Sequence, residues 1–123
     1  MVYKHIVMWK FKEQHNGKSA LENARWMKEQ LEALVGVVPE LLSAEVGISP
    51  ALEQVAAVPS NAEAAAEAPA QAASGEYDAC LLSTFASPEA LAAYKVHPKH
   101  KAISAYCKEA RLKRLAFDWW SEE

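Results

Sequence analysis

The sequence has little cysteine and no excess of basic residues, and both shortages exclude classes of protein. Its two cysteines, Cys80 and Cys107, have no CxxC spacing and lie in a strand-like and a helix-like segment. We therefore expect two buried, reduced thiols and neither a disulfide nor a metal-binding pair. The formal net charge is −3, whereas a nucleic-acid-binding protein needs a basic face. We expect no nucleic-acid partner.

Long hydrophobic runs are also missing. No apolar stretch approaches the roughly 20 residues that a helix needs to span a bilayer. Met1 opens directly into a strand pattern, and not into the basic segment and apolar run of a signal peptide. We expect a cytoplasmic protein without a membrane partner. The 123 residues suit a single domain, residues 1–123, that buries its core without disulfides or metals.

The apolar residues that are present recur with the periods of strands and helices. Four segments are strand-like: residues 2–11, 42–48, 77–85 and 112–120. Two amphipathic helical patterns lie between them, one from a capping box at Ser19 to Gly36 and one from Ser87 to Ala110, broken at Pro98. With right-handed crossovers, the order β-α-β-β-α-β predicts a ferredoxin-like α+β fold. Its four-stranded antiparallel sheet carries both helices on one face.

The composition changes abruptly between residues 50 and 75. Three prolines interrupt a run dominated by alanine and glutamate, and large apolar side chains are almost absent after Val58. A segment of this length between two strands is either a lid or a flexible insertion, and we favour the flexible insertion. Residues 61–68 could form two helical turns, which are marginal alone.

The predicted sheet has two apolar faces but helices for only one of them. The uncovered face carries Ile6 and Met8 on the first strand and Cys80 and Leu82 on the third. Such a face is too apolar to be left in water. We therefore expect a homodimer in which two copies pair their sheets face to face.

The candidate site is a cluster of aromatic and imidazole side chains around Pro98. Because proline fixes its own φ and lacks an N–H, it ends the helical turn that carries Tyr94 and starts the one that carries His100. Both side chains can then point into one space. His5, which projects from the middle of an apolar strand face, is their expected partner, while His97 next to the proline is expected to cap the second segment.

Five short motifs in the sequence match a known family. They are Lys4-His5-Ile6-Val7, Tyr77-Asp78, Phe85-Ala-Ser-Pro-Glu, Tyr94-x-x-His97-Pro98-x-His100 and Phe117-Asp118. With them the chain resembles the stress-responsive dimeric α/β-barrel (Dabb) family over its whole length except residues 50–75. The resemblance implies a ferredoxin-like protomer whose sheets associate into a dimeric α+β barrel.

The resemblance also implies roles for three residues. Plant members that act as polyketide cyclases use the tyrosine and the final histidine of the signature, with the first-strand histidine nearby. These roles would carry over to Tyr94, His100 and His5. The cyclases also place a histidine two residues after the tyrosine that opens the third strand, where this chain has Ala79.

Several functions stay open at this point. In one, His100 is a general base and Tyr94 its hydrogen-bond donor, acting without a cofactor on a small aromatic or β-keto ligand. Other readings are a non-catalytic ligand pocket, a structural cluster, or a monooxygenase on the same barrel. The histidines could also hold a metal, but no carboxylate is in obvious reach, so we expect no metal and no cofactor. The expected ligand contacts are Val7, Trp9, Leu81 and Ile103.

Overall fold

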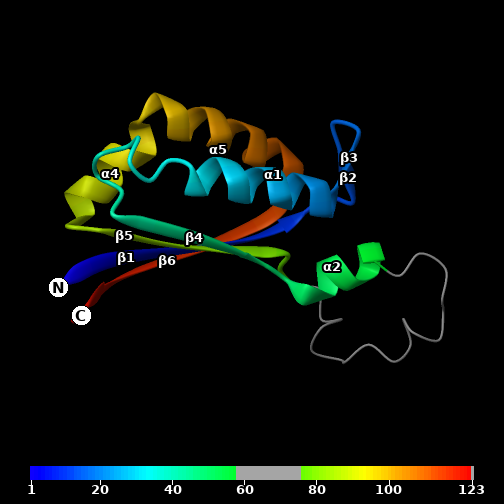
Figure 1. Cartoon of the computed structure of the whole chain (residues 1–123), viewed down its shortest axis with the longest axis horizontal. Coiled ribbons are helices and arrows are strands. Elements are labelled where there is room, and N and C mark those ends of the chain that lie inside the picture. The colour runs from blue at the N-terminus through cyan, green and yellow to red at the C-terminus, as the bar shows by residue number, and fades with distance from the viewer. Residues whose placement is uncertain (58–75, 123) are drawn as a thin grey trace.

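The computed structural model describes residues 1–57 and 76–122 and has one four-stranded antiparallel sheet in the order β4-β5-β1-β6 (Figure 1). The strands are β1 (Val2–Phe11), β4 (Ser43–Ile48), β5 (Ala79–Phe85) and β6 (Arg111–Ser121). Helices α1 (Ala20–Glu32), α4 (Pro88–Val96) and α5 (Pro98–Ala110) lie together on one face of the sheet. The predicted ferredoxin-like α+β fold is confirmed.

The inner face of the sheet, which faces these helices, holds the core. Alternate residues of β1 are buried there, and Val7, Trp9 and Phe11 are all less than 10% exposed. Because β5 pairs with β1 in register, Leu81 lies opposite Val7, and both face the same helices. Leu42, which the alternation places on this face, instead precedes β4 and is 51% exposed, since the edge strand begins only at Ser43.

Helix α1 begins where the sequence predicts and ends earlier. Ser19 and Glu22 form the expected capping box. The helix stops at Glu32, whereas the apolar period continues through Val38. The apolar pattern continues because the turns after the helix also pack against the core, where Leu34 and Val38 are buried. In these turns the N–H groups of Val37 and Val38 both donate to the Leu34 carbonyl. Gly36 lies in these turns at φ 87° and does not cap the helix directly.

The polar linker after β1 is a small hairpin. Strands β2 (Gln14–His15) and β3 (Lys18–Ser19) pair across Asn16-Gly17, which both adopt positive φ, as a type I′ hairpin turn requires. His15 is not a solvated loop histidine as its polar surroundings suggest. Its ring packs edge-on against Tyr106 at 5.4 Å between centroids.

The second helical segment is broken as predicted. Ser87 caps α4 and accepts a hydrogen bond from the Ala90 N–H, with Pro88 at the first helical position. The chain then turns at His97, and Pro98 opens α5. Two helices at an angle therefore replace one long one, and they present different residues to the sheet.

The first residues of the expected insertion form a helix. Helix α2 (Pro50–Ala57) follows β4, and its Ala51 is buried. The predicted turns at 61–68 and the rest of the insertion lie outside the described residues. None of the helices in residues 1–57 and 76–122 is long and apolar enough to cross a membrane.

The outer face of the sheet, away from the helices, is apolar. Its rows run across the strands, with Leu82, Ile6 and Phe117 in one row and Cys80, Met8 and Leu115 in the next. Phe117 is 64% exposed and Leu115 is 51% exposed. Phe117 also packs against Trp119, with ring centroids 5.8 Å apart. The chain therefore presents a large apolar surface on one side.

Candidate functional site

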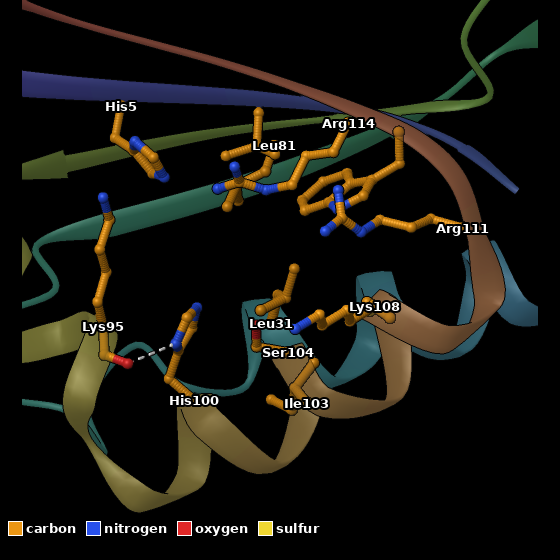
Figure 2. A pocket seen from close by; sticks show the side chains of 13 residues that line it. His5, Leu31, Leu81, Lys95, His100, Ile103, Ser104, Lys108, Arg111 and Arg114 are labelled. Carbon is orange, nitrogen blue, oxygen red and sulfur yellow. Dashed lines mark hydrogen bonds between the residues drawn. The ribbon is translucent and has the colours of Figure 1, made fainter.

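A cavity of about 280 Å³ lies between the inner face of the sheet and the helices. Figure 2 shows side chains from β1 and β6 on one side of it and from α4 and α5 on the other. The two expected imidazoles, His5 and His100, come from opposite layers and both line it. So do the four expected ligand contacts, Val7, Trp9, Leu81 and Ile103. The remaining lining residues are Leu31, Lys95, Ser104, Cys107, Lys108, Arg111 and Arg114.

His5 is held in one orientation by the last strand. Asp118 is its partner in the register of β1 and β6, and His5 Nδ1 lies 2.5 Å from Asp118 Oδ1. A carboxylate accepts hydrogen bonds, so Nδ1 carries the proton and donates. The nitrogen that remains is Nε2, without a proton in the neutral ring. The ring itself is buried, with the residue only 3% exposed.

His100 is held in the same way by a backbone carbonyl. Its Nδ1 lies 3.2 Å from the Lys95 oxygen, one of the carbonyls that the end of α4 leaves without a helical partner. The carbonyl can only accept, so Nδ1–H donates and Nε2 keeps its lone pair. Figure 2 shows the ring rising from α5 toward the strand layer, with its free end directed into the cavity.

Both imidazoles have pKa values below the ordinary value of 6.5. Burial is the main cause for each, because it penalises the charged ring. The positive charges of Lys95 and Arg114 lower both pKa values further, whereas Asp118 raises that of His5. At neutral pH the two rings are therefore uncharged and can accept protons.

Tyr94 lies beside His100 but not on the cavity wall. The centroids of the two rings are 4.3 Å apart. The Phe85 ring also packs against Tyr94, with 5.1 Å between their centroids. Tyr94 is 1% exposed, and its hydroxyl has no hydrogen-bond partner among the described residues. Burial raises the pKa of this phenol well above its usual range. The structure thus joins Tyr94 to His100 by packing and gives no hydrogen bond between them.

The His97 side chain hydrogen-bonds to the backbone and does not line the cavity. Its Nδ1 accepts from the Lys99 N–H at 3.1 Å, which caps α5 as the sequence predicts. In the part of the chain that the structure describes, no three His, Cys, Asp or Glu side chains gather closely enough to hold a metal ion.

On the helix side of the cavity, the sequence predicts His100 but not Ser104 or Lys108. His100, Ser104 and Lys108 follow one another at intervals of four, so they lie on one face of α5. This spacing was a usable signal. The pairing of Asp118 with His5 was not visible in the same way, because it depends on how the first and last strands align.

The fold and the cavity define a class of protein: a ferredoxin-like α+β domain with a small-molecule-sized cavity under its helices. The chain matches the family described as "Stress responsive A/B Barrel Domain" (Dabb) at residues 3–58 and 51–121. These matches cover most of the sequence, so the chain belongs to the Dabb family. A search of curated proteins finds no significant match to it.

Solved structures from bacteria and plants share the fold. A dimeric protein of unknown function with a ferredoxin-like fold from Bacteroides fragilis aligns over 98% of this chain and 96% of its own, with 22% identity and a TM-score of 0.69. The hydroxynitrile lyase from Passiflora edulis aligns over 99% and 95%, with 16% identity and a TM-score of 0.65. A Dabb family protein from Mesorhizobium loti aligns over 99% and 98%, with 15% identity and a TM-score of 0.61.

Proposed function

We propose that this Dabb-family chain binds a small organic molecule in the cavity and acts on it by acid–base chemistry without a cofactor. One observation carries the proposal. His5 and His100 come from opposite layers, each engages Nδ1 in a hydrogen bond, and each keeps an unprotonated Nε2 beside the same cavity. Two neutral imidazoles fixed in this way are suited to proton transfer near neutral pH.

The step we propose is removal of a proton from a carbon next to a carbonyl group. His100 Nε2 takes the proton, the C–H electron pair moves to form a C=C bond, and the carbonyl oxygen becomes an oxyanion. Lys95, which lies at the same end of the cavity as His100, supplies positive charge where that oxyanion develops. His100, now protonated at Nε2, returns that proton to the enolate to form the product, and His5, oriented by Asp118, offers a second bare Nε2 as a hydrogen-bond acceptor. Tyr94 supports the His100 ring by packing and takes no proton itself.

The fold is compatible with such chemistry. The hydroxynitrile lyase from Passiflora edulis has the same fold, so a lyase can be built on this sheet and these helices. A more specific form of this proposal is a reaction of the polyketide-cyclase type. Ala79 stands where those cyclases have a further histidine, so His5 and His100 would have to suffice.

Hydrogen–deuterium exchange tests the proposal without knowledge of the natural substrate. Acetophenone and benzylacetone are incubated with the protein in D2O, and loss of the protons next to the carbonyl is followed by NMR. We expect wild-type protein to accelerate the exchange and His100→Gln to lose most of that acceleration, since general bases contribute about 10²–10⁴-fold. His97→Asn is the matched control, because asparagine keeps the cap and lies outside the cavity.

Two results would contradict the catalytic part. One is exchange at the same rate in wild type, His100→Gln and buffer, and the other is an equal loss in His97→Asn. If the ketones stabilise the wild type against heat but do not exchange, the non-catalytic ligand pocket is the better description.

We also propose that the protein is a homodimer that pairs its outer sheet faces. Leu115 and Phe117 on that face are more than half exposed in the single chain, and an apolar surface of this kind favours association. Similar structures from Bacteroides fragilis, Jannaschia and Thermobifida fusca are described as dimeric, which supports a dimer here.

A further inference from the structure

The cavity is lined by a concentration of positive charge. The Lys and Arg side chains on its wall are Lys95, Lys108, Arg111 and Arg114. No carboxylate of the described residues lines it, although the chain has 16 acidic and only 13 basic side chains. Because acidic side chains outnumber basic ones in the sequence, a cavity lined by four cations and, among the described residues, by no carboxylate differs from the composition of the chain as a whole. The positive charge of the cavity wall favours a negatively charged ligand.

These four cations have no carboxylate partner, unlike three of the lysines elsewhere in the described residues. Lys10 pairs with Asp78, Lys28 with Glu32 and Lys113 with Glu76. Across residues 1–57 and 76–122, no hydrogen bond or ion pair engages the charged group of Lys95, Lys108, Arg111 or Arg114. Asp118, the acid whose charge acts on Arg114, is already bound to His5.

A β-bulge brings the two arginines to the same face. Trp9 pairs with Arg114 and Phe11 with Arg111, so two steps along β1 correspond to three steps along β6. Residues three apart in a regular strand point to opposite faces. The extra residue, Leu112, absorbs the difference and is 63% exposed, while Arg111 turns to the inner face. The strand thus departs from regular pairing at the place where it adds a second guanidinium to the cavity.

The cavity has two ends of different chemistry. Figure 2 shows Lys108 and Arg111 at one end, His5, Lys95 and His100 at the other, and Arg114 reaching between them. Apolar side chains line the wall between the ends. They are Val7, Trp9, Leu31, Leu81 and Ile103. A bare inorganic anion would leave this apolar wall without a contact, and a neutral compound would leave the cations unpaired.

We infer that the ligand is a small organic carboxylate, with its carboxylate held by Lys108, Arg111 and Arg114 and its apolar body against the wall. This deepens the proposed function and rests on it for the identity of the cavity as the ligand site. The guanidinium fork matches a carboxylate with two parallel hydrogen bonds. The volume of about 280 Å³ is near the lower limit of ligand pockets, roughly 300–1,000 Å³. It restricts the body to one ring or a short chain.

The orientation follows from the same arrangement. With the carboxylate at the Lys108–Arg111 end, the far part of the molecule reaches His5 and His100. A carbonyl group there, as in a keto acid, would place its neighbouring C–H bond beside the His100 base. Burial and the nearby charge of Arg111 lower the pKa of Arg114, so an anion between the two arginines would relieve an existing repulsion.

Matched pairs of acids and amides test the inference. Binding of benzoate and phenylacetate to the full chain is measured by calorimetry at low salt, beside benzamide, phenylacetamide and inorganic phosphate. The amides keep shape and lose the charge, whereas phosphate keeps charge and loses the apolar body. We expect each acid to bind at least about tenfold more tightly than its amide and than phosphate. Arg111→Gln and Arg114→Gln should each lose about tenfold, the value of one charge-assisted hydrogen bond.

Lys101→Gln is the matched control, because Lys101 is exposed on α5 and is not part of the cavity wall. It removes the same charge and should leave binding unchanged. The inference is overturned if neither acid binds, if amides or phosphate bind as well as the acids, or if Lys101→Gln loses as much as the arginine variants.

The outcome of this binding experiment is independent of the outcome of the hydrogen–deuterium exchange test. Carboxylate binding that depends on Arg111 and Arg114, with no ketone exchange, would keep the ligand class and reject the acid–base reaction. Ketone exchange that depends on His100, with no preference for acids over amides, would keep the reaction and reject the carboxylate.

Discussion

His5 and His100 are useful at neutral pH because the fold removes them from water and fixes one nitrogen of each. Asp118 and the Lys95 carbonyl take the two Nδ1–H groups, which leaves the Nε2 atoms for a ligand. The convergence of the two histidines could be predicted from their positions on a strand face and after a proline. Their hydrogen-bond partners could not, because that of His5 depends on how the first and last strands align and that of His100 on the local geometry of the break between α4 and α5.

The lowered pKa values of the two histidines predict a pH dependence of stability. In the unfolded chain each ring binds protons with its ordinary pKa of 6.5, whereas in the folded state it binds them less readily. The unfolded state therefore gains protons first as the pH falls. We expect the free energy of unfolding to be fully present above pH 6.5 and to decrease as the pH falls through the lower folded-state values.

Urea denaturation at a series of pH values from above 7 to 5 measures this dependence. His100→Gln should give a shallower decrease than wild type, since one of the two rings no longer titrates. The charged groups that act on the remaining ring, His5, are Asp118, Lys95 and Arg114, and all three stay in place in that variant. A steeper decrease, or stability that rises on acidification, would contradict the lowered pKa values.

Tyr94 offers a second test at this scale. Because its buried hydroxyl has no partner among the described residues, removing the oxygen should not cost stability. We expect Tyr94→Phe to be as stable as wild type or more stable by about 1 kcal/mol, since an unsatisfied buried hydroxyl is unfavourable. Chemical denaturation gives the difference. A loss of more than about 1 kcal/mol would instead mean that the hydroxyl has a partner in the folded protein, as a hydrogen-bonded cluster with His100 would require.

At the scale of elements, the break between α4 and α5 is what brings His100 under the sheet. His97 sits at the junction and holds it with the hydrogen bond from the Lys99 N–H. We expect His97→Ala to lose about 1 kcal/mol of stability, the usual contribution of a helix N-cap. His97→Asn should regain most of it, because asparagine is a good N-cap. Equal losses in the two variants, measured by urea denaturation, would show that the imidazole does something other than cap α5.

The elements also show where sequence reasoning succeeds and fails. Local signals gave the Ser19 capping box, the Ser87 cap and the break at Pro98, because each depends only on residues next to it. The end of α1 was predicted too late, since buried turns continue the apolar period of a helix. The bulge at Leu112 was missed, because strict alternation assumes an uninterrupted ladder. With it, the inward direction of Arg111 was missed as well.

For the whole molecule, the outer sheet face is the proposed dimer interface. Ile6, Leu82 and Phe117 form an apolar row across three strands, and a stable interface here should bury at least roughly 1,200 Å² in total. We expect wild-type protein to sediment as a dimer at micromolar concentration and Phe117→Glu to sediment as a folded monomer. A buried glutamate without a partner opposes association, whereas on the exposed strand of a monomer it is tolerated.

Val96→Glu is the control for that experiment. Val96 is 66% exposed, close to the 64% of Phe117, but it lies at the end of α4 and not on the outer sheet face. It should leave the dimer intact. A wild-type monomer, or dissociation by both substitutions, would contradict dimerisation through the sheet.

The most direct test of the cavity as an acid–base site is the protonation of its two imidazoles. Long-range proton–nitrogen NMR correlations of the histidine rings distinguish Nδ1–H, Nε2–H and doubly protonated forms. Above neutral pH we predict that His5 and His100 are both neutral, with the proton on Nδ1 and a bare Nε2 facing the cavity. Protonation of Nε2 on His100, or a charged ring at that pH, would leave the cavity without its base and would contradict the proposed function.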